Sequence, residues 1–198
     1  MNPYAIIATI ASVLIVILAF VGSVPTYHAA PLFVLPLLWG VYFLRRKLHV
    51  IPFHYALFAI AILFHMLGTF GYYQRSPLPW SFDVYVHFYF AFAIAFVLER
   101  FFRIYLGGRV WPARVATLMF MMGFGALHEI MEYVTYLLLG EERGMLKPHT
   151  SYFFDTQRDL LNNLLGRLTA LMVITIAQRF TSPRAEVDSP ARARDRAS

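Results

Sequence analysis

The hydrophobic residues of the chain fall into six long runs that are separated by short polar or charged segments. A helix that crosses the hydrocarbon core of a bilayer needs about 20 predominantly apolar residues, and each run has that length or comes close to it. The runs are Tyr4–Gly22, Pro31–Leu44, Ile51–Tyr73, Asp83–Phe102, Pro112–Leu139 and Asp155–Phe180. The pattern predicts an all-α, polytopic membrane protein with a bundle of six transmembrane helices in residues 1–180. Residues 181–198 are polar, which predicts a disordered cytoplasmic tail.

The composition excludes most soluble classes of protein. Of the 198 residues, 59% are hydrophobic and only 14% are charged, against roughly 25% charged residues in an ordinary soluble domain. The chain has no cysteine, so disulfides, thiolate metal sites and cysteine nucleophiles are also excluded. The net charge of +6 is carried mostly by residues that flank the apolar runs, which is typical of membrane orientation. We therefore expect membrane lipids, and no nucleic acid, as partners.

The distribution of Lys and Arg predicts how the helices are oriented. Basic residues are enriched in cytoplasmic segments of membrane proteins. Twelve of them lie in or beside the segments after the second, fourth and sixth runs, whereas three lie in the segments on the other side, and Arg158 and Arg167 lie inside the last run. The first set is Arg45, Arg46, Lys47, Arg100, Arg103, Arg109, Arg114, Arg179, Arg184, Arg192, Arg194 and Arg196, and the second is Arg75, Arg143 and Lys147. We expect both termini in the cytoplasm of a bacterial cell and the bundle in its cytoplasmic (inner) membrane.

Polar side chains inside the predicted helices gather at one depth. An ionisable residue in the middle of a transmembrane helix costs about 2.5–3.5 kcal/mol on insertion scales, so each one needs a physical reason. In the predicted orientation these residues all lie in the outer half of the bilayer. They are His65, Asp83, His87, His128, Glu129, Glu132, Asp155, Asp159, Asn162 and Asn163.

The spacing of these residues places several of them on common helix faces. Asp83 and His87 are four residues apart, as are Asp155 and Asp159, and Glu129 and Glu132 are three apart. Five carboxylates at one depth cannot all stay ionised without a cation or shared protons. A divalent metal would supply that charge, and the imidazole favours zinc. The sequence predicts metal ligands at Asp83, His87, Glu132 and Asp159.

The remaining polar residues receive supporting roles. Glu129 or Asp155 would act as general base, and His65, Gln157 and Asn163 would bind or orient a substrate. Gly123 and Gly125 in the fifth run, and Gly166 in the sixth, are small enough to let the fifth and sixth helices approach closely.

Each of these residues also has a simpler interpretation. Asp83 and Asp155 could be N-caps of their helices, and His65 could be an interior histidine with its own hydrogen bond. His128 is adjacent to Glu129, so both side chains are not expected to face one centre. Capping explains none of Glu129, Glu132 and Asp159.

Four motifs in order along the chain resemble those of the YjdF-like family of bacterial membrane proteins. They are DVYVHF at Asp83–Phe88, LER at Leu98–Arg100, HEIMEY at His128–Tyr133 and FFDTQRDLLNNLLG at Phe153–Gly166. The last motif also resembles the closing helix of VanZ-like proteins, through Asp159, Asn163 and Gly166. The chain departs from the YjdF-like pattern at Ser151-Tyr152, where Gly-Asp is usual, and at Tyr133, where Trp is common. The VanZ-like resemblance implies glycopeptide resistance or a role with envelope glycolipids.

Three functions remain open at this point. The first is a metal-dependent hydrolase or transferase that acts on lipid or lipid-linked envelope substrates. The second is a non-catalytic protein whose polar cluster binds a lipid, a glycolipid or an antibiotic. The third is a small transporter, in which the helices form a homo-oligomer around a pathway. The near absence of ionisable residues from the inner halves of the helices makes the third function the weakest.

Overall fold

The computed structural model describes residues 2–139 and 152–181, and every regular element within them is helical. The α-helices are α1 (Pro3–Val21), α2 (Pro31–Leu44), α3 (Pro52–Met66), α4 (Phe82–Tyr105), α5 (Val110–Leu139) and α6 (Tyr152–Thr181). Two 3₁₀ helices, Pro25–Ala29 and Leu67–Phe70, extend the ends of the second and third spans. All six spans are long and apolar enough to cross a membrane, which confirms the predicted fold class. Of the predicted tail only Thr181, the last residue of α6, is described.

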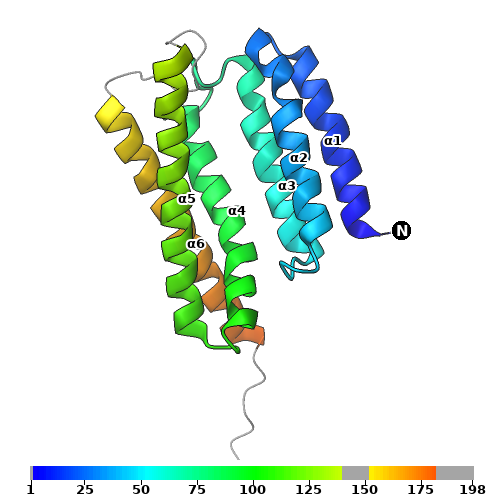
Figure 1. The fold of residues 1–198 in the computed structure, drawn as a ribbon, viewed down its shortest axis with the longest axis vertical. Helices are drawn as coiled ribbons and strands as arrows, with labels where there is room; N and C mark the ends of the chain where they lie inside the picture. The colour runs from blue at the N-terminus through cyan, green and yellow to red at the C-terminus, as the bar shows by residue number, and fades with distance from the viewer. Residues whose placement is uncertain (1, 140–151, 182–198) are drawn as a thin grey trace, which may run out of the picture.

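The helices form two groups of three (Figure 1). In the first group, small residues of α1 such as Ala8 and Ala11 pack against Tyr55 and Ile62 of α3. In the second group α4 packs most extensively against α6 and less against α5. Contacts between α3 and α4 join the groups, so α4 is the central helix of the molecule.

The outer surface of the bundle is apolar. Large side chains such as Phe20, Leu138 and Trp111 are exposed on it. In water a continuous surface of this kind would be unstable, whereas in a bilayer it contacts lipid chains. The exposed residues therefore fit a multi-pass membrane protein.

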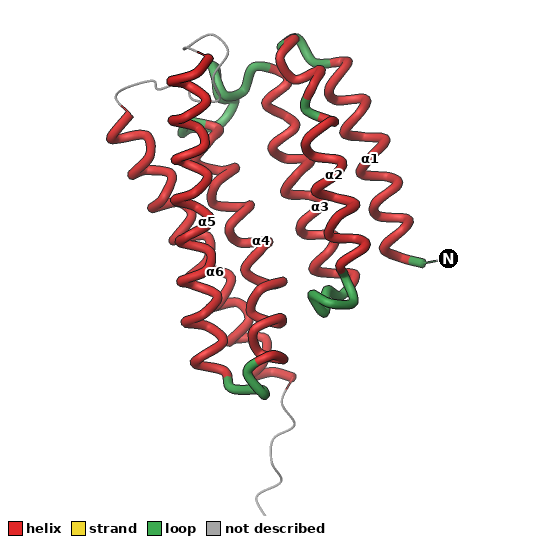
Figure 2. The backbone as a smooth tube through the Cα atoms, in the orientation of Figure 1, coloured by secondary structure: helices red, strands yellow, loops and turns green. Residues whose placement is uncertain are grey.

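Successive helices run in opposite directions, so α1 begins and α6 finishes at the same end of the bundle (Figure 2). We call this the termini end, and it also carries the loops that follow α2 and α4. The opposite end carries the segment between α3 and α4 and the beginnings of α4 and α6.

Gly166 allows α4 and α6 to approach closely. A Cβ atom at this position would overlap the backbone oxygen of Phe88 in α4. The sequence interpretation that Gly166 brings α6 against α5 is therefore wrong, because its partner is α4. Gly125 does face α6, but a Cβ atom added at Gly123 would have no neighbouring atom within 4 Å, so Gly123 has no such role.

We expect Gly166→Ala to lower the free energy of unfolding by about 1–3 kcal/mol, because the new methyl group forces α4 and α6 apart. Gly123→Ala is the matched control. It adds the same methyl group to open space and should leave stability unchanged or slightly higher, by up to about 1 kcal/mol. Denaturation of the purified protein by titration with SDS measures both. Equal effects would contradict the close contact of α4 with α6.

We propose that the termini end faces the cytoplasm, as the Lys and Arg distribution indicates. Gln74 and Lys47 are exposed in loops at opposite ends, and the cysteine-free chain allows single-cysteine labelling. In intact cells a membrane-impermeant maleimide should label Gln74→Cys, and it should label Lys47→Cys only after permeabilisation. The reverse pattern would show that the orientation is inverted.

Candidate functional site

The first turns of α4 and α6 lie at the opposite end and carry the acidic residues of the site. Asp83 is in the first turn of α4, and Asp155 is in the first turn of α6. The N-cap of α4 is Ser81, and α6 begins three residues before Asp155. The interpretation of Asp83 and Asp155 as N-caps is therefore wrong, but both lie in the first turn, where the helix dipole still favours a negative charge.

Three side chains from α4 and α6 converge on one point. One donor atom from each of Asp83, His87 and Asp159 lies within 4.8 Å of the other two. The Nε2 atom of His87 is 3.4 Å from Oδ1 of Asp83 and 3.8 Å from Oδ2 of Asp159. Asp159 is only 1% exposed, whereas the side chain of Asp83 is 23% exposed. We call these residues the triad, and Asp83 is its most accessible member.

Arg158 holds the second oxygen of each triad carboxylate. Its Nη2 lies 3.5 Å from Oδ2 of Asp83, and its Nε lies 3.4 Å from Oδ1 of Asp159. It also forms an ion pair with Asp155. In each triad aspartate, one carboxylate oxygen therefore faces the guanidinium of Arg158 and the other faces His87. The cation that the five carboxylates require is supplied in part by the protein itself.

Asn163 fixes the imidazole of His87 from the other side. Its side-chain amide lies 3.2 Å from Nδ1 of His87. The amide atom at this distance is Nδ2, which donates, so Nδ1 accepts and a neutral His87 carries its ring proton on Nε2, towards the two aspartates. Metal binding at Nε2 would need the amide of Asn163 rotated, so that its oxygen accepts a proton from Nδ1. The sequence predicts that Asn163 orients a substrate, and in the structure it positions His87.

Comparison with family models identifies the relatives of this chain. The model of a family described as predicted membrane protein (DUF2238) matches residues 4–180, from α1 to the end of α6. The chain belongs to the DUF2238 family. The predicted resemblance to YjdF-like membrane proteins is consistent with this family, whereas the VanZ-like resemblance of α6 stays a prediction. Neither curated proteins nor solved structures give a match.

Two glutamates of α5 lie beside the triad of this DUF2238 protein, but neither belongs to it. Glu132 pairs with His128, whose Nε2 lies 3.2 Å from its Oε1. The ring of His128 is 5.7 Å from that of His87, so His128 faces the cluster after all. The structure therefore places Glu132 outside the group of three ligand atoms, contrary to the predicted four-ligand set.

Glu129 is 4% exposed; neither of its carboxylate oxygens makes a well-formed hydrogen bond to the described residues, although the hydroxyl of Thr156 in α6 is near enough to interact with it. It lies within electrostatic range of His87 and His128. A buried carboxylate without well-formed hydrogen bonds is suited to accept a proton from a water molecule or a substrate. The environment of Glu129 therefore fits the predicted role of general base. Asp155 fits this role less well, because it forms an ion pair with Arg158.

The other predicted substrate-binding residues lie at the edge of the cluster or away from it. Nδ1 of His65 in α3 and the hydroxyl of Tyr73 share a hydrogen bond of 2.6 Å. Burial raises the pKa of Tyr73 well above its usual value, so the hydroxyl keeps its proton. His65 is therefore an interior histidine with its own hydrogen bond, which is the simpler interpretation of this residue. Gln157 is exposed on α6, and no described contact joins it to the triad.

Arg158 is the residue that the sequence interpretation missed. By sequence it is only a basic residue within the last helix. The signal was available, because Arg158 is three residues after Asp155 and adjacent to Asp159, and a cation placed inside a membrane helix must pair with a neighbouring acid. Asp83 is 75 residues away in the sequence, so its contact with Arg158 could be found only from the folded structure.

Proposed function

We propose that the triad binds a divalent metal ion and serves a hydrolase or transferase reaction on a lipid or lipid-linked envelope substrate. The observation that carries this proposal is that the two carboxylate oxygens of Asp83 face different partners, and that those of Asp159 do so too. Arg158 holds one oxygen of each carboxylate and leaves the other facing Nε2 of His87. Residues that orient metal ligands from behind in this way are typical of metal sites.

The spacing of the donor atoms supports a single metal ion. Two ligands bonded at about 2.0–2.1 Å to one tetrahedral zinc are about 3.3 Å apart. The distances from His87 Nε2 to the two aspartate oxygens are 3.4 and 3.8 Å, and all three donor atoms lie within 4.8 Å of one another, so the side chains would move closer together around an ion. Three protein ligands leave a coordination position open, as in catalytic rather than structural zinc sites.

The donor set favours zinc, although its two carboxylates also admit manganese or iron. Imidazole is a poor ligand for magnesium and calcium, which prefer oxygen donors throughout. A bound ion of this kind would supply Lewis-acid activation of water at neutral pH.

The surrounding residues have separate tasks in this proposal. Glu129 accepts a proton, because its buried oxygens make no well-formed hydrogen bond to described residues. Arg158 holds Asp83 and Asp159 in position, and Asn163 holds His87. A substrate enters past Asp83, the most accessible triad residue, from the end that we propose faces outwards. Lipid headgroups at that depth are within reach of the site.

Arg158 also favours a second candidate function. Its guanidinium contacts three carboxylates and so neutralises part of their charge without a metal. Shared protons could account for the rest, and the cluster would then bind a lipid or glycolipid headgroup without catalysis. This is the non-catalytic alternative of VanZ-like type.

The two candidates differ in metal content. For the metal site, we expect one equivalent of zinc, manganese or iron in protein purified at neutral pH without chelators. His87→Ala and Asp159→Asn each remove a ligand and should lower metal occupancy at least about tenfold, as loss of even an outer-shell partner can. Elemental analysis by plasma mass spectrometry measures this for every metal at once.

His28→Ala is the control, because His28 is exposed and lies outside the cluster. It should retain the metal content of the original protein. If the unmodified protein holds no stoichiometric metal, and none can be added back, the metal-dependent reaction is contradicted and the binding function is favoured.

A further inference from the structure

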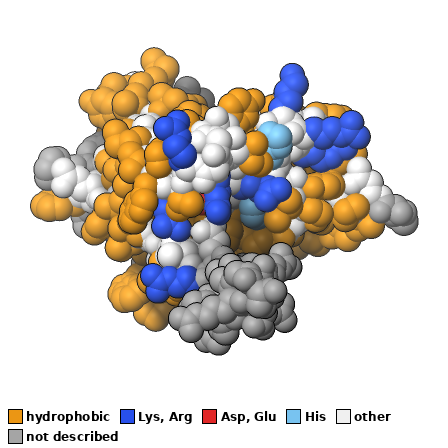
Figure 3. All heavy atoms as spheres, turned by 90° about the horizontal axis from the view of Figure 1, so that it is seen from below, with side chains coloured by type: hydrophobic (Ala, Val, Ile, Leu, Met, Phe, Trp, Pro, Cys, Tyr) orange, Lys and Arg blue, Asp and Glu red, His pale blue; other side chains and the backbone are white. Residues whose placement is uncertain are grey.

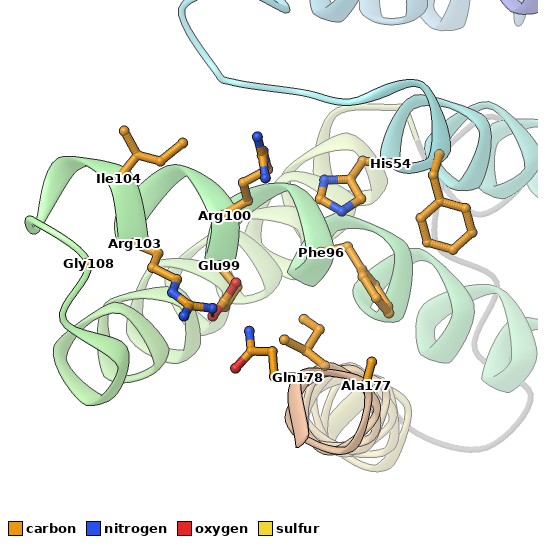
Figure 4. Close-up of a pocket in the computed structure, with 11 residues that line it drawn as sticks. His54, Phe96, Glu99, Arg100, Arg103, Ile104, Gly108, Ala177 and Gln178 are labelled. Atoms are coloured by element: carbon orange, nitrogen blue, oxygen red, sulfur yellow. Dashed lines mark ion pairs between the residues drawn. The ribbon is translucent and has the colours of Figure 1, made fainter. Parts of the chain in front are cut away.

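A second polar pocket lies at the termini end, away from the triad (Figure 4). It has a volume of about 560 Å³ and is bounded by α3, α4 and α6. His54 stands in the first turn of α3, and Gln178 stands in the last turn of α6. Because both residues lie near the ends of their spans, the pocket is at the depth of the lipid headgroups.

The pocket lining includes a buried carboxylate, Glu99, with one unpaired oxygen. Glu99 of α4 is 4% exposed, and its Oε1 has no hydrogen-bond partner among the described residues. The nearest cation is Nη1 of Arg103, at 3.9 Å, which is too far for a hydrogen bond. A buried carboxylate oxygen without a donor loses its hydration without compensation, so the position favours a ligand that brings N–H groups.

His54 is the second buried polar residue of the pocket lining. It is 8% exposed, and its Nδ1 has no hydrogen-bond partner in the described part of the chain. Figure 4 shows His54, Glu99 and Arg103 arranged around the pocket, with Phe96 between α3 and α6. Two buried polar side chains from different helices therefore line one cavity, and each has one atom without a partner among the described residues.

The rim of the pocket is basic and its walls are apolar. Arg100 and Arg103 line it, and Nε of Arg100 is fixed by a 2.9 Å hydrogen bond to the carbonyl of His49. Figure 3 views this end, where Lys and Arg side chains gather around the surface. Phe96 and Ile174 supply apolar wall, against which an acyl chain can lie. One carboxylate, two guanidiniums and an apolar wall together match a headgroup that carries both charges.

We propose that this pocket binds the headgroup of a phospholipid that carries a primary amine, such as phosphatidylethanolamine. The ammonium group donates hydrogen bonds to Glu99, and the phosphodiester lies between Arg100 and Arg103. A quaternary ammonium has no N–H to donate, and the hydroxyls of a glycerol headgroup bring no positive charge to the carboxylate. The pocket therefore discriminates by the amine rather than by the phosphate.

The test is lipid retention by the full chain in nanodiscs that contain equal amounts of phosphatidylethanolamine, phosphatidylcholine and phosphatidylglycerol. Lipids that remain on the protein after release from the nanodisc are counted by native mass spectrometry. We expect phosphatidylethanolamine to be retained about tenfold over phosphatidylcholine, the effect of one charge-assisted hydrogen bond. Glu99→Gln should abolish that preference, and Arg103→Gln should lower retention of phosphatidylethanolamine and phosphatidylcholine together.

Arg109→Gln is the control for general attraction to the basic end. Arg109 is exposed in the loop after α4 and does not line the pocket, so its loss should leave retention unchanged. Thermal unfolding of each variant shows that it is folded.

Three results would overturn the proposal. The first is a preference for phosphatidylethanolamine that survives in folded Glu99→Gln protein. The second is retention of phosphatidylglycerol equal to that of phosphatidylethanolamine. The third is displacement of the lipid by free phosphoethanolamine at equal concentration, which would indicate a site for a soluble amine.

Discussion

A charged side chain inside a membrane helix needs a neighbour that offsets its charge, and this constraint determines how α4 and α6 meet. Asp83, Asp155 and Asp159 would be costly there if each stood alone. Arg158 contacts all three, and His87 takes the remaining oxygens of the two triad aspartates. The cluster therefore links the two helices, and it does so with one donor atom from each triad residue facing a common point.

The close contact at Gly166 makes this arrangement possible. Without a side chain at that position, the backbone of α6 lies against Phe88 of α4, one residue beyond His87. The aspartates of α6 are then near enough to reach the imidazole. Packing of small residues and pairing of charges thus act on the same pair of helices, and each depends on the other.

The sequence predicts the fold closely because the apolar runs are long and bounded by charges or turns. Each observed helix begins within three residues of its predicted start, for example Pro3 against Tyr4 and Tyr152 against Asp155. The shared face of Asp83 and His87 also follows from the spacing alone. Local spacing does not reveal which helices are neighbours, so the pairing of Gly166 with α4 and the reach of Arg158 to Asp83 were not predicted. His128 and Glu132 are four residues apart, so spacing alone also places this pair, which the sequence interpretation did not use, on one helix face.

The direct test of this arrangement is a double-mutant cycle between Asp83→Asn in α4 and Arg158→Gln in α6, measured as the free energy of unfolding in a titration with SDS. If the two side chains meet, the double variant should lose less stability than the two single variants together, by about 0.5–3 kcal/mol. Effects that add to within about 0.3–0.5 kcal/mol would mean that the residues act independently. In that case α4 and α6 would not form one charged site, and the proposed metal centre would have no basis.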